Sequence, residues 1–238
     1  EAKRTSFIWT DEEIAKFKAG TDKNLFPNYE LEDYILQAVA PQTTHTLSLR
    51  GGNNQVKYYI SGRYLYQDSF FKDGIDDYNG YSVRSNIDAN ISKNFSIALD
   101  ILGRRDDVRR AVGSTTIDQV DIGSTIVDHI DIGFFELLSA TDPTKPIYEN
   151  NWVEMIKGKG GEKNNRTTTL NSQVTAKWEL PFITKGLFME GTAAYDFANI
   201  RTKEFSKSFD LYSYDNSTGE YINKNVNPVK NRSLYDYY

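Results

Sequence analysis

The stretch that decides the fold is HTLSLRGGNNQVKYYISGRYLYQDSFFKDG, residues 45–74. From Val56 to Tyr66 every second residue is Val, Tyr, Ile or Gly, and this period of two predicts a β-strand with two unlike faces. The apolar face could pack against the core of a soluble protein, or it could face the lipid around a membrane barrel. Alternation alone does not distinguish these two kinds of sheet. The positions between are Lys57, Tyr59, Ser61, Arg63 and Leu65.

The same alternation recurs on both sides of this stretch. Residues 45–50, 78–91, 95–101, 168–180 and 187–197 each alternate apolar with polar side chains, and a weaker strand is expected at 203–214. The turn GGNN at 51–54 has hairpin chemistry, because Gly and Asn tolerate positive φ. About seven antiparallel strands are therefore expected, several of them longer than the strands of about 5–6 residues that globular proteins use.

The connections between these strands alternate in length. Short turns are expected at 51–55, 92–94 and 181–186, and longer connections at 71–78, 105–165 and 215–219. Consecutive antiparallel strands put alternate connections at opposite ends, so all the tight turns fall on one rim. Outer-membrane barrels have this asymmetry, with short periplasmic turns and long extracellular loops.

Composition excludes several classes of protein. The 238 residues carry a net charge of −5, which argues against general nucleic-acid binding, and the absence of cysteine excludes disulfides and thiolate metal sites. The sequence contains no run of about 18 apolar residues, so it predicts no membrane helix. The mean hydropathy of −0.59 does not decide between the two classes of sheet, because membrane strands also alternate.

The N-terminal part is expected to contain helix and loop in place of β-strands. TDEEIAKFKAG, residues 10–20, predicts a short helix with a capping box of Thr10 and Glu13 and with Gly20 after its last turn. A loop surrounds Pro27, and a second helical segment is expected at 30–38, before Pro41. The chain starts with EAKR and closes on LYDYY, and we expect it to be a piece of a longer polypeptide.

Residues 45–72 and 78–104 together resemble the first barrel strands of SusC/RagA-like TonB-dependent transporters. That family has a His-x-Leu-Ser strand, a Gly-Gly turn, a Tyr-rich strand ending in Gln-Asp or Gln-Glu, and a Tyr-x-x-x-Arg-Ser-Asn-(Ile/Leu)-Asp strand. The matching residues are His45, Leu47, Ser48, Gly51, Gly52, Gln67, Asp68, Tyr81, Arg84, Ser85, Asn86, Ile87 and Asp88. Tyr81 departs from the family form, since it lies one residue too near Arg84. Residues 11–28 and 175–197 are similar to further segments of the same family.

The resemblance implies an all-β fold: an antiparallel membrane β-barrel segment of about seven strands from a larger barrel of roughly 22, with long extracellular loops and a short N-terminal helix. It divides the chain into a plug-to-barrel segment or extracellular loop (1–44), barrel strands (45–104), a long extracellular loop (105–165) and further barrel strands (166–238). It also implies an outer-membrane location and TonB-driven import of glycan or peptide fragments. The implied partners are a SusD-like surface lipoprotein as lid, TonB through a plug outside this chain, and membrane lipid.

No catalytic group is expected, because import makes no bond and the two histidines, His45 and His129, have no triad partners in the sequence. If the apolar face meets lipid, a set of polar-face residues would face the lumen and contact plug or substrate. This set is Lys57, Tyr59, Arg63, Arg84, Asn86, Asp88 and Asp100. In the long loop, Phe134, Tyr148 and Trp152 could stack on sugar rings.

A short repeat in the long loop is the one candidate for a cofactor-binding site. Asp118, Asp121, Asp128 and Asp131 could hold calcium, which prefers oxygen ligands, although their spacing is not that of an EF-hand. The alternative is a set of solvated loop carboxylates. The sequence is also compatible with two other functions: a soluble all-β glycan-binding module, and an outer-membrane adhesin-type barrel.

Overall fold

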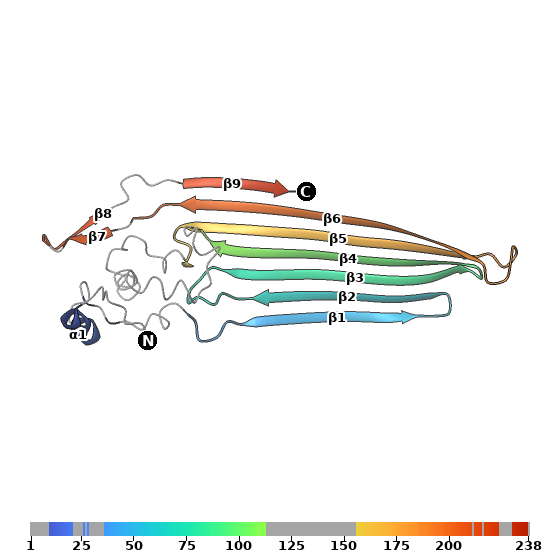
Figure 1. Ribbon diagram of the computed structural model, residues 1–238, viewed down its shortest axis with the longest axis horizontal. Coiled ribbons are helices and arrows are strands. Elements are labelled where there is room, and N and C mark those ends of the chain that lie inside the picture. Colours follow the sequence, from blue (N-terminus) through green and yellow to red (C-terminus); the bar gives the residue numbers. More distant parts are fainter. Residues whose placement is uncertain are drawn as a thin grey trace, which may run out of the picture.

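The computed structural model describes residues 10–20, 26, 28, 36–112, 156–210, 212–215, 217–223 and 230–237. Within them lie one helix, a seven-stranded antiparallel sheet in the order β1-β2-β3-β4-β5-β6-β9, and a separate hairpin of β7 and β8 (Figure 1). The elements are α1 (Asp11–Ala19), β1 (Gln42–Gly52), β2 (Val56–Gln67), β3 (Asp77–Ser92), β4 (Phe95–Ala111), β5 (Gly161–Glu179), β6 (Phe188–Lys207), β7 (Tyr212–Asp215), β8 (Glu220–Asn223) and β9 (Lys230–Tyr237).

Helix α1 has the capping box that its sequence predicts. The Thr10 N–H donates to the Glu13 carboxylate at 2.8 Å, and the Glu13 N–H donates to the Thr10 hydroxyl at 3.3 Å. These bonds to Thr10 lower the pKa of Glu13. Gly20 ends the helix with φ 57°. In the described part of the chain, no helix is long and apolar enough to cross a membrane.

The tight turns lie together at one end of the sheet, as predicted. Figure 1 shows the β1–β2, β3–β4 and β5–β6 connections at that end, and α1, β7 and β8 at the opposite end. In the first turn, Asn53 Oδ1 accepts the N–H groups of Gln55 (2.8 Å) and Val56 (2.9 Å). Gly52 has φ 145°, and a Cβ there would lie 2.3 Å from the Val56 carbonyl oxygen, so this turn requires glycine.

Three predicted boundaries are wrong. β4 continues to Ala111 and β5 begins at Gly161, so the connection between them is shorter than the predicted loop of 105–165. The alternation is hidden there because both faces become charged: Arg104 pairs with Asp106 on one face and Arg105 with Asp107 on the other, each at 2.7 Å.

The other two corrections concern β6 and the segment before β1. β6 runs unbroken to Lys207, where a separate strand at 203–214 was predicted. Of the second helix predicted at 30–38, residues 30–35 lie outside the described residues. Leu36 forms a β-bridge with Phe71 instead, because the Gln37 N–H bonds to the Phe70 carbonyl at 3.0 Å.

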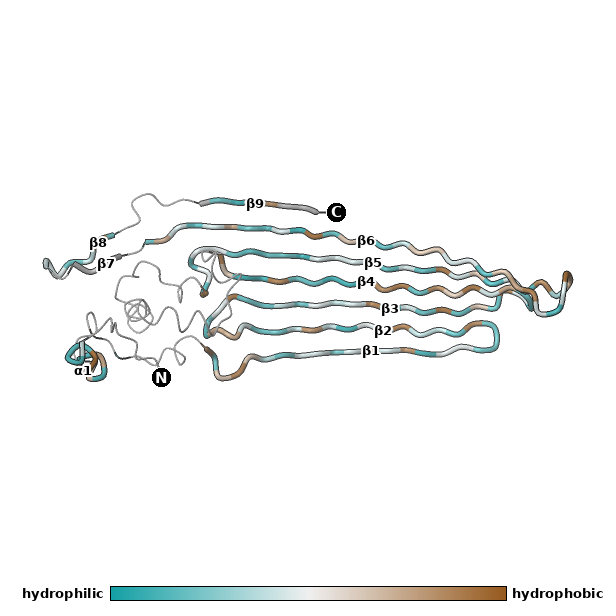
Figure 2. Tube along the Cα trace, viewed as in Figure 1, coloured by the Kyte–Doolittle hydropathy of each residue, from teal (hydrophilic) through white to brown (hydrophobic). Residues whose placement is uncertain are grey.

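The sheet is a single layer without a core. Among the described residues, Ile156 is the one large hydrophobic side chain that is buried, whereas Leu47, Tyr195 and Val83 are 81%, 61% and 58% exposed. A soluble sandwich would bury Val56 and Ile60, yet about two fifths of each is exposed. Hydrophobic segments recur along β2 to β6 between hydrophilic ones (Figure 2). The apolar face of this sheet is therefore not covered by the described part of the chain.

Candidate functional site

One face of the sheet carries a continuous apolar belt. Strand register aligns the apolar positions of neighbouring strands, for example Ile87 with Leu99 and Leu99 with Val174. We define the belt as even-numbered residues 56–62 and 170–176 and odd-numbered residues 47–51, 83–89, 97–103 and 191–197. None of these residues is charged. A band of this composition needs an apolar surrounding, because its side chains are left exposed by the sheet itself.

Aromatic side chains border the belt at both ends. At the end away from the tight turns, Tyr64 stacks on His45 with ring centroids 6.2 Å apart and lies 5.1 Å from Tyr81. We call this the upper aromatic row. At the tight-turn end, Phe95 pairs in register with Trp178, whose ring lies 6.4 Å from that of Phe182. We call this the lower aromatic row.

The opposite face is polar and gathers the predicted site residues. In the register of β2 and β3, Lys57 lies opposite Asp88, Tyr59 opposite Asn86, and Ser61 opposite Arg84. Arg63 follows on the same face. The structure thus brings the six predicted residues of β2 and β3 onto one surface, and their contact with plug or substrate stays a prediction.

A shallow groove of about 400 Å³ crosses this polar face from β3 to β6. On its floor the Asn86 amide donates to Asp100, and the Asn171 amide donates to Asp196 Oδ1 at 2.8 Å. Asn86 Oδ1 is buried and has no hydrogen-bond partner among the described residues. We call this the polar groove. It presents the carboxylates of Asp100 and Asp196, which accept hydrogen bonds, beside the Arg84 guanidinium, which donates them, so it suits a polar ligand that carries N–H or O–H donors.

The sequence did not identify the whole of the polar groove. Asn171, Gln173 and Asp196 line it together with Arg84, Asn86 and Asp100. The alternation of polar and apolar residues indicates which face these residues occupy, since Gln173 and Val174 are neighbours on opposite faces. Only the pairing of β4 with β5 shows that they lie near Asn86.

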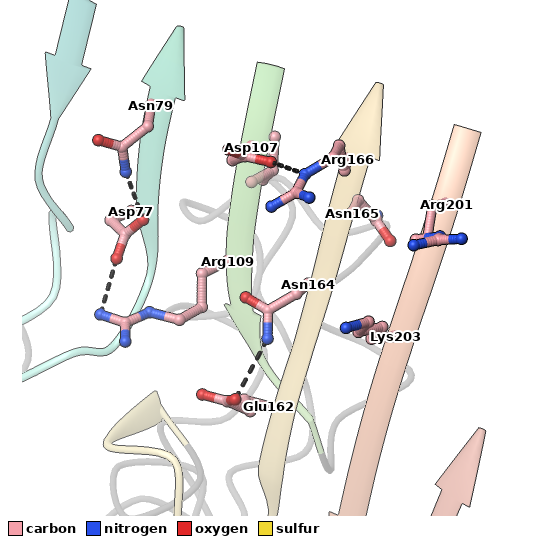
Figure 3. Close-up of a pocket in the computed structure, with 11 residues that line it drawn as sticks. Asp77, Asn79, Asp107, Arg109, Glu162, Asn164, Asn165, Arg166, Arg201 and Lys203 are labelled. Carbon is pink, nitrogen blue, oxygen red and sulfur yellow. Dashed lines mark hydrogen bonds and ion pairs between the residues drawn. The ribbon is translucent and has the colours of Figure 1, made fainter. Parts of the chain in front are cut away.

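A second groove, of about 500 Å³, lies on the belt face, and strand register places it just beyond the upper aromatic row. Figure 3 shows the residues that line it. Asp77 and Arg109 pair in it at 2.7 Å, and Asp107 pairs with Arg166 at 2.6 Å. Arg201 and Lys203 of β6 line its far side (Figure 3). We call it the charged groove. The sequence does not reveal it, because the alternation of apolar and polar side chains is lost around Arg105.

The remaining predicted site residues lie outside the described residues. They are Asp118, Asp121, Asp128, Asp131, Phe134, Tyr148 and Trp152. Calcium binding and sugar stacking by these residues therefore stay predictions. Within the described ranges no group of three or more His, Cys, Asp or Glu side chains could hold a metal ion.

No protein-family model matches the chain. It is 29% identical over 97 residues to TonB-dependent receptor P3 from Formosa agariphila, a match that covers 40% of this chain and 9% of the receptor. Two solved structures of the RagAB peptide importer, in its closed-closed and open-open states, have similar folds, with TM-scores of 0.55 and 0.54 at 16% identity. They cover 77% and 87% of this chain and 20% and 24% of the solved chains.

This chain thus spans less than a quarter of the proteins that it matches. The seven-stranded sheet corresponds to part of a transporter barrel, and the resemblance predicted from residues 45–104 is confirmed. The chain resembles a segment of a SusC/RagA-like TonB-dependent transporter.

Proposed function

We propose that the chain forms part of the barrel wall of an outer-membrane TonB-dependent transporter. The observation that carries this proposal is the one-layer sheet whose uncharged apolar belt is exposed on one face while the other face is polar. In a membrane barrel the first face meets lipid and the second meets the lumen. A soluble binding module would need a second layer over the belt, and the described residues supply none.

The height of the belt supports this arrangement. Phe95 in the lower aromatic row and Arg105, which pairs in register with Tyr81 of the upper aromatic row, lie ten residues apart along β4. Ten residues span about 33 Å of strand, and a tilt of about 40° reduces this to about 25 Å across the membrane. That is the height of the apolar band between the aromatic girdles of outer-membrane barrels. β4 then continues to Ala111, so the strands project beyond the bilayer on that side.

The polar groove supports import of short oligomers. Asp100 and Asp196 accept hydrogen bonds, and both a peptide backbone and the hydroxyl groups of a sugar offer donors to them. Peptides are the first class to test, because the RagAB structures are of a peptide importer; glycan fragments are the second. We propose a SusD-like lipoprotein as lid and TonB as the source of energy, and no bond-making step.

The experiment compares uptake and location for the full-length protein in its own host. Labelled oligopeptides and oligosaccharides are supplied to cells with and without the gene, and with and without an uncoupler of the proton gradient. We expect gene-dependent, energy-dependent uptake of one class, and recovery of the protein only after detergent extraction of membranes. Recovery in the aqueous fraction without detergent would overturn the membrane location. Uptake that does not depend on the gene would overturn the transport role.

A further inference from the structure

The charged groove starts directly above the upper aromatic row, on the face of the belt. Asp107, Arg166 and Arg201 align in register two residues beyond the row of Tyr81 and Arg105. Arg109, Asn164 and Lys203 form the next row. At about 3.3 Å per residue and a tilt of about 40°, these rows lie about 5 and 10 Å above the aromatic row.

Basic groups outnumber acidic ones in this groove, although the whole chain has a net charge of −5. Its lining has four basic and three acidic residues, and a fifth base, Arg105, pairs with Asp107 from the row below at 2.7 Å. The acids orient the arginines without using all their donors, since each guanidinium has five N–H groups. The groove therefore presents several positive N–H donors around a space of about 500 Å³.

We infer that the charged groove binds the phosphate of an anionic lipid in the outer leaflet. The inference rests on the proposed function, because only a membrane barrel presents this face to lipid. The polar layer of a bilayer extends roughly 5–8 Å beyond the hydrocarbon, so the first charged row lies within this layer and the second lies at its outer edge. The groove lies at the end of the sheet opposite the tight turns, and tight turns of such barrels are periplasmic.

The chemistry favours phosphate over a zwitterionic headgroup. Arginine forks bind phosphate oxygens in pairs and lysine adds a point charge, whereas a choline or ethanolamine group would bring a positive charge next to Arg201 and Lys203. Imported cargo is not the occupant, because the charged groove and the polar groove lie on opposite faces of the sheet. The acyl chains of the lipid would extend over the belt, so one lipid molecule would cover both the charged groove and the belt.

The test measures lipid binding by the full-length protein in detergent micelles, with lipid A as a phosphorylated glycolipid and phosphatidylethanolamine as a zwitterionic lipid. Native mass spectrometry reports the fraction of protein that carries each lipid. The variant is Arg201→Gln with Lys203→Gln. The matched control is Arg50→Gln with Lys177→Gln, which removes the same charge from the polar face.

We expect lipid A binding to weaken about 25-fold in the Arg201/Lys203 variant, because each basic residue at an anionic membrane surface contributes about a factor of five. The control should stay within about twofold, and Arg201→Lys alone should fall between them because the charge remains but the fork is lost. Circular dichroism verifies that both double variants keep the strand content of the parent.

Three outcomes would overturn the inference: equal losses in variant and control, equal binding of the two lipids by the parent, or displacement of lipid A by millimolar inorganic phosphate, which would indicate a site for free anions. Each of these can occur in a protein that still fractionates with membranes and still imports, so failure here leaves the proposed function standing. A protein found in the aqueous fraction would instead overturn both.

Discussion

Val174 and Gln173 are neighbours in β5 that point to opposite faces, and arginine at each position tests the orientation of the sheet. Val174 pairs with Leu99 in the belt and is 40% exposed. Gln173 pairs with Asp100 and lines the polar groove. Thr168, on the same strand and face as Val174 but level with Tyr81 of the upper aromatic row, provides a control for depth.

The position of each residue between the two aromatic rows sets the expected cost. Leu99, the partner of Val174, lies four residues from Phe95 and six from Arg105, so its row is within about 3 Å of the middle of the belt. Arginine on the lipid face costs about 2–4 kcal/mol at the bilayer midplane and about 0–1 kcal/mol near the interface. We therefore expect a loss of about 2–4 kcal/mol for Val174→Arg and about 0–1 kcal/mol for Thr168→Arg.

Gln173→Arg should change the free energy of unfolding by less than about 0.5 kcal/mol, because the new guanidinium faces a polar groove that holds Asp100. The assay is urea unfolding of the full-length protein in lipid vesicles, followed by circular dichroism. The loss of about 2–4 kcal/mol expected for Val174→Arg corresponds to a decrease of about 30-fold or more in the folded-to-unfolded ratio. A greater loss for Gln173→Arg than for Val174→Arg, or equal losses at all three positions, would refute the orientation.

Three further predictions concern the turn, the rim and the polar groove. Gly52→Ala should cost about 1–3 kcal/mol, because φ 145° is accessible almost only to glycine; urea unfolding checks this, and Gly62→Ala, where a Cβ meets nothing within 4 Å, should be nearly neutral. Burial raises the pKa of Asp76, which accepts a β4 backbone N–H at 2.8 Å, so folding favours the protonated carboxyl. Local stability should thus fall as pH rises from the unfolded pKa of about 3.9 to the raised folded value. Hydrogen exchange of the β4 end, corrected for intrinsic rates, should show this fall, and Asp76→Asn should abolish it; an unchanged profile in the variant would assign the fall to another group. Asn86→Leu should weaken the uptake proposed for the polar groove about fivefold, because Asp100 loses the amide that positions it and roughly 1 kcal/mol of hydrogen bonding is lost. Uptake kinetics at equal surface levels measure this effect, the belt variant Ile87→Leu should leave uptake unchanged, and equal losses in both would exclude a role for the polar groove.

The sequence predicts those parts of the fold whose signals are local. The turn at 51–54 depends on its own glycines and asparagines, and the faces of β2 depend on alternation within Val56–Tyr66. The ends of β4 and β5 were not predictable in this way, because between Arg104 and Asp107 both faces are polar and the period of two disappears. The charged groove also required a pairing across the long connection, since Arg166 meets Asp107 from 59 residues away.

The polar groove shows the same limit. Its β3 residues, Arg84 and Asn86, were predicted because they alternate with belt residues in one strand. Asn171 and Asp196 carry the same kind of local signal. What the sequence did not provide is the register that places them beside Asn86, which depends on how four strands align.

The two rims of the sheet differ in how much change they tolerate during evolution. An insertion in a tight turn such as 53–55 would break the bonds of Asn53 to Gln55 and Val56 that hold the hairpin, and a one-residue slip of register would turn the belt residues of β2 to the polar face. An insertion in the connection after Ala111 leaves all strand pairs in place, and doubling the length of a loop costs only about 0.6 kcal/mol. The rim opposite the tight turns can therefore acquire new loop sequences while the pairing of the strands stays the same.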